Sequence, residues 1–281
     1  MTKIISDTST LYTPEQAKEV GLYLAPLCVN ISGQNYREFV DIDDNKLLSL
    51  IKEGGIPKTS QPPVGEKIDL YNSLGKDDDV IDITIADGLS GAYNSALSAK
   101  ESCECPEKIT VFNSKTLCGP HRYVVDEALK MAKEGASKDE ILAMLEKSVA
   151  TELSMLVPVD FSFLKRGGRI SKAAASLGGL LKLHICVIKT DDGKMIEKHS
   201  ISRTLKGNVN SMMQELTKRG YDNSYLFTVA HAQNPELAEA IKAGIEKTFP
   251  GANIDVVALS PAFITQGGPG CCALQVIKLA H

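Results

Sequence analysis

The first half of the chain alternates short apolar runs with helix-forming segments, and this alternation limits the fold more than any other feature. The runs KII, YLAPLCVNI, VIDITIA and KITVF are typical of buried strands. Between them, Thr13–Gln16 forms a capping box, Asp43 can cap a helix, and YVVDEALKMAKEG forms a helix that ends at Gly135. Strands separated by helices of this length predict βαβ units and a parallel sheet.

The second half has a different order of elements. ELSMLVPV is typical of a strand, KRGGRIS reads as a glycine-rich link, and two strands flank the hairpin signal Asp192–Gly193. A helix from Thr204 to about Arg219, the strand YLFTVA and a helix capped by Asn234 follow. This order predicts a mixed or antiparallel sheet.

The uncharged run Val256–Ile277 is long enough to resemble a membrane span, but Pro261, Pro269 and several glycines interrupt it. We interpret it as two buried strands joined by a turn. The complete pattern predicts an α/β protein of two α/β domains. Residues 1–150 form a domain with a parallel sheet, and residues 151–281 form one with a mixed or antiparallel sheet.

Composition narrows the class of protein. The 281 residues are 43% hydrophobic and 23% charged, as in an ordinary globular protein. The net charge of −4 argues against nucleic acid as a partner. MTKIISDTST lacks the apolar core of a secretory signal, and the odd number of cysteines, 7, is typical of reduced thiols, so we expect a cytoplasmic protein. The cysteine spacings match no metal site, and we expect no metal.

Five loops collect polar or basic residues: DTST, PKTSQPP, GLSGAYNSA, TQGGPG and KRGGRIS. Each lies at the end of a predicted strand or the start of a predicted helix, where open α/β sheets bind ligands. Ser90 and Gly91 at a helix start can simply cap the helix, or their N–H groups and hydroxyl can bind an anion. KRGGRIS can be a solvated turn, or its arginines can contact an anion or a partner protein.

In this order, the loops resemble those of the DegV family of bacterial fatty-acid-binding proteins. PKTSQPPVGE is similar to the family's Lys-Thr-Ser-Gln-Pro block, and LSGAYNSA to its Leu-Ser-Gly-Thr-Tyr-x-Ser-Ala block. FLKRGGRIS, GGPG and the opening DTST segment extend the resemblance over nearly the whole chain. It implies a lipid-binding carrier with two α/β domains, a fatty acid in a cleft between them, and no catalytic centre or cofactor of its own.

The family further implies that a separate fatty acid kinase phosphorylates the bound carboxylate for phospholipid synthesis. We expect a monomer without stable membrane insertion, with Arg169 and Arg203 as candidate kinase contacts. The candidate residues for binding the ligand carboxylate are Thr59, Ser60, Ser90, Gly91, Gln266, Gly267 and Gly268.

Several positions depart from the family pattern: Gln266, the pair Ala86–Asp87, and His184–Ile185 in place of the usual Lys-Pro. Gln266 stands where the family usually has histidine, and it can donate a hydrogen bond but cannot carry a positive charge. Asp87 replaces a family serine and would repel a carboxylate that it faced.

These departures leave two alternative functions open. One is a diverged carrier of another amphiphilic acid. The other is a serine hydrolase with Ser90 as nucleophile, which requires a base such as His121, His184, His199 or His231 near its hydroxyl.

Overall fold

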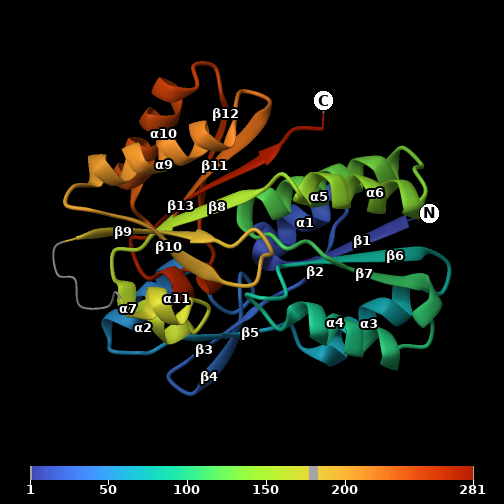
Figure 1. Cartoon of the computed structure of the whole chain (residues 1–281). Coiled ribbons are helices and arrows are strands. Elements are labelled where there is room, and N and C mark those ends of the chain that lie inside the picture. Colours follow the sequence, from blue (N-terminus) through green and yellow to red (C-terminus); the bar gives the residue numbers. More distant parts are fainter. Residues whose placement is uncertain (1, 177–182, 281) are drawn as a thin grey trace. The chain divides into compact units, whose positions relative to one another are not determined.

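The computed structural model describes residues 2–176 and 183–280, which divide into two compact units (Figure 1). The first unit contains the chain up to Ala150 together with Ser260–Ala262, and the second contains Thr151–Leu259 and the chain from Phe263 onward. Among these residues, no helix is both long enough and apolar enough to cross a membrane.

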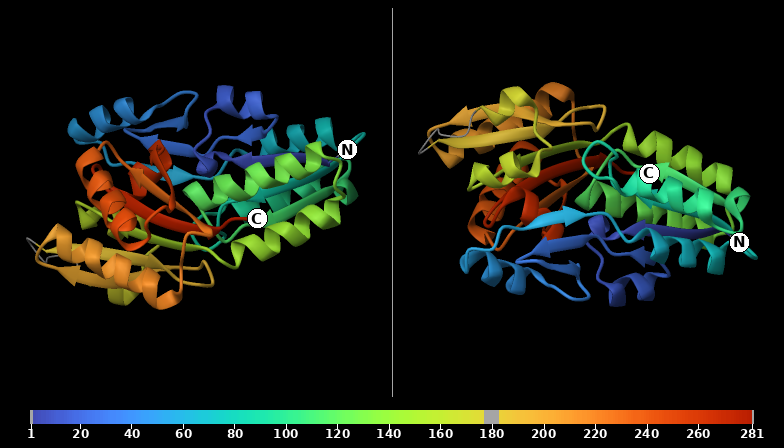
Figure 2. Two further views of the ribbon diagram at one scale, coloured as in Figure 1. Left: turned by 90° about the horizontal axis from the view of Figure 1, so that it is seen from above. Right: turned by 90° about the horizontal axis from the view of Figure 1, so that it is seen from below.

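A four-stranded parallel sheet of order β2-β1-β6-β7 forms the centre of the first unit. Its strands are β1 (Thr2–Asp7), β2 (Tyr23–Ala25), β6 (Asp79–Thr84) and β7 (Ile109–Asn113). The helices are α1 (Pro14–Val20), α3 (Val64–Leu74), α4 (Ala92–Ser102), α5 (Cys118–Lys133) and α6 (Lys138–Val149). Helices α3 and α4 cover one face, and α5 and α6 lie side by side on the other (Figures 1 and 2). The predicted parallel sheet is confirmed.

A small antiparallel sheet of order β4-β3-β5 also belongs to the first unit. It consists of β3 (Cys28–Ile31), β4 (Gln34–Arg37) and β5 (Lys58–Ser60), with α2 (Asp44–Lys52) between β4 and β5. The prediction that YLAPLCVNI is one strand was therefore wrong. The run divides around Pro26, which has no N–H for a strand ladder, so β2 and β3 join different sheets.

The second unit contains a six-stranded mixed sheet of order β10-β9-β8-β13-β11-β12, as predicted in type. Only the β11–β12 pair is parallel among its described strand pairs. The strands are β8 (Leu153–Val157), β9 (His184–Lys189), β10 (Ile196–Ser202), β11 (Tyr225–His231), β12 (Asn253–Ala258) and β13 (Cys272–Lys278). Helices α9 (Leu205–Arg219) and α10 (Pro235–Thr248) pack on one face, where apolar side chains of β8, β11 and β13 meet them.

One further prediction for the second half was wrong. Val256–Ile277 does not form two strands joined by a turn, because α11 (Pro261–Gly267) lies between β12 and β13. Pro261 suits the first helical position, where a missing N–H costs nothing, and Gly268 follows the helix with φ +85°. The prediction that KRGGRIS is a glycine-rich link was incomplete. Helix α7 (Phe161–Gly167) extends into this segment, Gly168 is its C-cap, and the link leads to α8 (Lys172–Ala175).

The helix caps predicted at Thr13, Asp43 and Asn234 are confirmed. Thr13 forms a complete capping box, as does Ser137 at the start of α6. Asp43 accepts a bond from the Lys46 N–H, and Asn234 accepts one from the Leu237 N–H. The seven cysteines are all free thiols in buried positions, as expected for small core residues.

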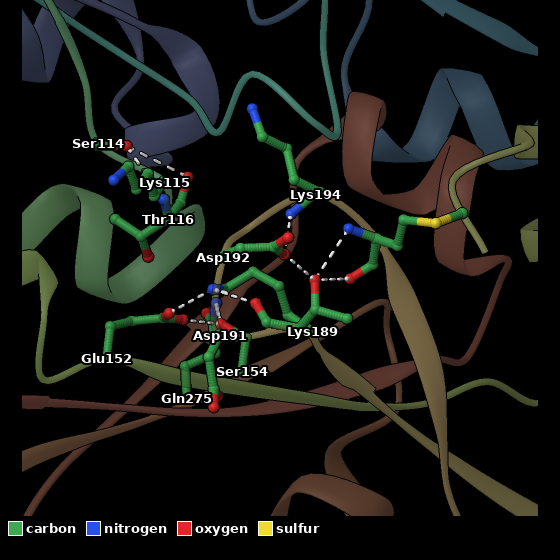
Figure 3. A network of polar contacts seen from close by, with 12 residues as sticks. Ser114, Lys115, Thr116, Glu152, Ser154, Lys189, Asp191, Asp192, Lys194 and Gln275 are labelled. Atoms are coloured by element: carbon green, nitrogen blue, oxygen red, sulfur yellow. Dashed lines mark hydrogen bonds and ion pairs between the residues drawn. The ribbon is translucent and has the colours of Figure 1, made fainter. Parts of the chain in front are cut away.

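A buried ion pair in the second unit joins Glu152, the residue directly before β8, to Lys189 at the end of β9 (Figure 3). Lys189 Nζ lies 2.8 Å from Glu152 Oε2, and both side chains are almost fully buried. Ser154 donates to the other Glu152 oxygen, and Gln275 Nε2 donates to Ser154 Oγ at 2.7 Å. The charges are therefore satisfied within a hydrogen-bonded network, as buried charges require.

A second buried ion pair connects α3 to β6 of the parallel sheet. Lys67 Nζ lies 2.5 Å from Asp82 Oδ2, and both side chains are fully buried. The Tyr71 hydroxyl, one helical turn after Lys67, donates to the same oxygen. Burial, with the Asp82 charge, raises the pKa of Tyr71, so the tyrosine stays protonated and can donate.

We predict that Asp82→Asn lowers the free energy of unfolding by about 3 to 5 kcal/mol, because it leaves the Lys67 ammonium buried without its counter-charge. The double variant Lys67→Met/Asp82→Leu should regain much of that loss. Urea denaturation followed by circular dichroism measures both. The control is Asp79→Asn, which removes the carboxylate of the partly exposed Lys138–Asp79 pair and should cost less than about 1 kcal/mol. Equal losses in the Asp82 and Asp79 variants would contradict the prediction.

Candidate functional site

The carboxylate of Asp7 joins the ends of two neighbouring parallel strands. Asp7 is the last residue of β1 and is fully buried. One of its oxygens accepts the Ser9 N–H at 3.0 Å, and the other accepts the Ile85 N–H at 2.9 Å, just beyond β6. This bond fixes the start of the segment that leads from β6 to Ser90.

His121, near the start of α5, contacts residues at the ends of the same two strands, β1 and β6. Its Nε2 lies 3.2 Å from both the Ile83 carbonyl oxygen and Ser6 Oγ, while Nδ1 contacts Ser9 Oγ. A carbonyl can only accept, so Nε2 carries the proton and Nδ1 accepts the Ser9 hydroxyl proton. Burial lowers the pKa of His121, which agrees with a neutral ring.

Ser90 and Gly91 lie at the start of α4, as predicted. Ser90 is half-buried, and its Oγ accepts the Ala92 N–H at 3.2 Å, so its own proton can be donated to a ligand. Gly91 is the N-cap, and a Cβ there would lie 3.1 Å from Gln61 Oε1. The PKTSQPP and LSGAYNSA segments therefore meet at this point.

The other candidates of PKTSQPP lie on β5. Thr59 is half-buried and pairs with Val29 of β3, whereas Ser60 is exposed and pairs with Cys28. Asp87 lies in the segment before Ser90, where its N–H donates to Asn113 Oδ1 at 3.3 Å. Among the predicted segments of the first unit, the structure thus brings PKTSQPP and LSGAYNSA together through Gln61 and Gly91.

In the second unit, the predicted TQGGPG and KRGGRIS segments contact each other. Gln266 is half-buried near the end of α11, and its Oε1 occupies the space that a Cβ on Gly167 would fill. Gly267 and Gly268 are buried, and the Gly268 N–H donates to the Ile264 carbonyl at 2.8 Å. Gly167 is therefore required at this position for the present orientation of Gln266.

The two predicted arginines differ in their surroundings. Arg169 is half-buried, donates to the Gly167 carbonyl at 2.5 Å, and has its pKa lowered by burial. Arg203 is exposed directly before Thr204, the N-cap of α9. Arg169 and Gln266 thus both contact Gly167, Arg169 at its carbonyl and Gln266 at its Cα. Arg203 lies on the surface of its unit.

Sequence reasoning missed the buried residue Glu38 near the strand ends. Glu38 follows β4 and accepts bonds from the Thr8 hydroxyl and the Ala262 N–H. His121 was named only as one of four possible bases for Ser90. The one available signal was the DTST loop, whose three hydroxyl residues are all buried and need polar partners.

His121, the histidine of the first unit, contacts Ser6 and Ser9 rather than Ser90. Both ring nitrogens of His121 are occupied, and the Ser90 hydroxyl oxygen bonds the Ala92 N–H. Nothing in this geometry supplies the base that the Ser90 hydrolase hypothesis requires. Within residues 2–176 and 183–280, no three His, Cys, Asp or Glu side chains are grouped to hold a metal ion.

Comparison with known proteins gives full-length matches. A family model described as "Uncharacterised protein, DegV family" matches residues 1–279. A DegV domain-containing protein of Staphylococcus aureus strain N315 is 30% identical over 99% of this chain and 100% of its own length.

Two solved structures share the fold. The crystal structure of DegV from Bacillus subtilis, described as a fatty acid binding protein, has a TM-score of 0.82 and 27% identity. The alignment covers 99% of this chain and 99% of the DegV chain. A stearic acid-binding protein from Eubacterium ventriosum has a TM-score of 0.84 and 26% identity, with 99% of this chain and 98% of that chain covered.

We predict that the stability difference between the wild-type protein and His121→Gln narrows as the pH falls below about 6.5. The unfolded chain gains a proton on His121 at that pH, whereas the folded chain resists it, so the wild type loses up to about 1.4 kcal/mol per pH unit. Urea midpoints from pH 8 to pH 5 measure the difference. Exposed His184→Gln is the control, and a gap that stays constant with pH would refute the buried neutral ring.

Proposed function

The chain belongs to the DegV family, and we propose that it binds a long-chain fatty acid and presents the carboxylate to a separate fatty acid kinase. The observation that carries the proposal is the match with Bacillus subtilis DegV over 99% of both chains, a protein described as binding fatty acid. The loops that we expect to contact the head group lie at the ends of β5 and β6 and around α11.

The first unit supplies the hydroxyl donors of the proposed site. Ser90 has a proton to donate because its oxygen already caps the Ala92 N–H. Gly91 has no side chain to cover its backbone, and a carboxylate near the start of α4 meets N–H groups and a favourable dipole. We propose that Thr59 and Ser60 on β5 add hydroxyls to the same carboxylate.

The second unit supplies an amide donor in the proposal. The Gln266 Oε1 lies against Gly167, and we propose that the amide of Gln266 donates to the ligand carboxylate. The adjoining Gly267 and Gly268 allow close approach of backbone. Neutral hydroxyls and amides can satisfy a buried carboxylate without a metal, while the acyl chain contributes about 0.8 kcal/mol per buried CH₂ before binding costs.

The kinase hand-off is proposed to use the two arginines of the second unit. A guanidinium is always charged and binds planar acidic groups through several N–H donors. Arg203 is exposed and suits a contact with a partner protein. Arg169 donates to the Gly167 carbonyl, and Gln266 lies against the same glycine. The proposed role of the chain is thus that of a carrier, which acts before a separate enzyme in phospholipid synthesis.

We predict that the purified protein retains a long-chain fatty acid, detectable by lipid extraction and mass spectrometry. Thr59→Val and Ser90→Ala should each weaken binding of hexadecanoate by about tenfold to a hundredfold, the loss expected for one hydrogen bond to a charged group. Calorimetric titration of delipidated protein measures the change.

Ser98→Ala is the matched control for Ser90→Ala. Ser98 lies on the same helix, is exposed, and donates only to the Asn94 carbonyl among its described bonds. Unchanged affinity in all three variants would exclude the proposed carboxylate site. Acids of shorter chain or different head group, titrated alongside, identify a diverged carrier if one of them binds more tightly than hexadecanoate.

For the hand-off, we predict that Arg203→Ala reduces acyl-phosphate formation with the cognate kinase several-fold while fatty acid binding stays unchanged. The variant removes an exposed charge and therefore lowers the productive encounter with the partner. Lys206→Ala, another exposed cation close by on α9, is the control. If both variants support the wild-type rate, Arg203 has no role in the hand-off.

A further inference from the structure

Glu38 is a fully buried carboxyl that connects two polar segments of the chain. It follows β4 directly, and its backbone N–H donates to the Leu27 carbonyl at 2.9 Å. Oε1 accepts a bond from the Thr8 hydroxyl, and Oε2 accepts the Ala262 N–H at 2.7 Å. The side chain thus joins the end of β1 to the first turn of α11.

Thr8 is held in place for this contact. Its Oγ1 accepts the Leu27 N–H at 2.9 Å, which directs the hydroxyl proton toward Glu38. Thr8 also follows Asp7, whose carboxylate joins β1 to the segment after β6. The Thr8 hydroxyl that bonds Glu38 and the Asp7 carboxylate that holds the start of the Ser90 segment are therefore neighbours at the end of β1.

Ala262 is the second residue of α11, and Gln266 and Gly267 end the same helix. The helix has only seven residues, so a bond to its first turn restrains the position of its last turn. Glu38 is in this way mechanically connected to the amide that the proposed function places on the ligand carboxylate.

The surroundings of Glu38 favour its neutral form. Burial raises its pKa to about 7, with a further contribution from the Asp7 carboxylate, whereas the Thr8 and Ala262 hydrogen bonds act in the opposite direction. A further titratable group near it is the Cys28 thiol on β3, because the Glu38 charge contributes to the raised pKa of that thiol. Residues 260–262 contribute no titratable side chain.

We propose that Glu38 is a positioning residue for the head-group end of α11, and that release of its proton loosens α11 and weakens fatty acid binding. The inference rests on the proposed function. A buried Glu38 holds its proton to higher pH than a Glu38 exposed by local opening, so raising the pH favours the opened arrangement. Binding that requires a docked α11 then weakens with rising pH, by at most about tenfold per pH unit for one proton.

The test compares the wild type with Glu38→Gln, which stays uncharged over the whole pH range and whose amide oxygen can still accept the Ala262 N–H. The dissociation constant for hexadecanoate is measured from pH 6.5 to pH 8.5. We expect it to rise several-fold in the wild type and to stay nearly constant in the variant. Exposed Glu53→Gln, at the end of α2, is the control and should follow the wild type. Equal pH profiles in wild type and Glu38→Gln would overturn the proposal.

Hydrogen exchange in ligand-free protein separates this inference from the proposed function. After correction for intrinsic exchange, protection of the Ala262 amide should fall between pH 6.5 and pH 8.5 in the wild type but not in Glu38→Gln. If this occurs and no fatty acid binds, the proposed ligand is wrong and the positioning role stands. If Ala262 protection has the same pH dependence in both proteins, the positioning role is wrong whether or not fatty acid binds.

Discussion

The buried Asp7 carboxylate is the contact on which the polar part of the first unit depends. It closes the turn Thr8–Thr10 through the Ser9 N–H and holds the segment after β6 through the Ile85 N–H. From that turn, Ser9 reaches His121 and Thr8 reaches Glu38. A buried charge must be compensated by donors, and here the donors are the backbone groups that set the loop geometry.

Features of the fold that depend on residues close together in the sequence were predicted correctly, whereas two features that depend on distant residues were not. The caps at Thr13, Asp43 and Asn234 depend on residues within one turn, and these were predicted correctly. The division of YLAPLCVNI between two sheets and the helix Pro261–Gly267 were missed. An uninterrupted apolar run has the same appearance in a strand and in a short buried helix, and only distant partners decide between them.

The candidate site follows the same division. Motif order located the segments of Thr59, Ser90 and Gln266, and the structure brings Gln61 to Gly91 and Gln266 to Gly167 within their respective units. Neither contact could be derived from spacing, because each depends on tertiary packing. The role of Glu38 was harder still to predict from the sequence, because a glutamate after a short exposed strand usually lies in solvent. Only the structure shows that Glu38 is fully buried.

The buried titratable groups around Asp7 have a common bias that bears on how an anion would be held. Burial raises the pKa of Glu38 to about 7 and lowers the pKa of His121, so both are driven toward their neutral forms. Apart from Asp7, this cluster therefore works through hydrogen bonds rather than charge. The hydroxyls and amides proposed for the ligand carboxylate, including neutral Gln266, continue that pattern. A site of this kind gains little from long-range attraction, and its affinity depends on hydrogen-bond geometry and the apolar tail. A side chain that shifts the end of α11, as Glu38 is proposed to do, then has a direct effect on binding.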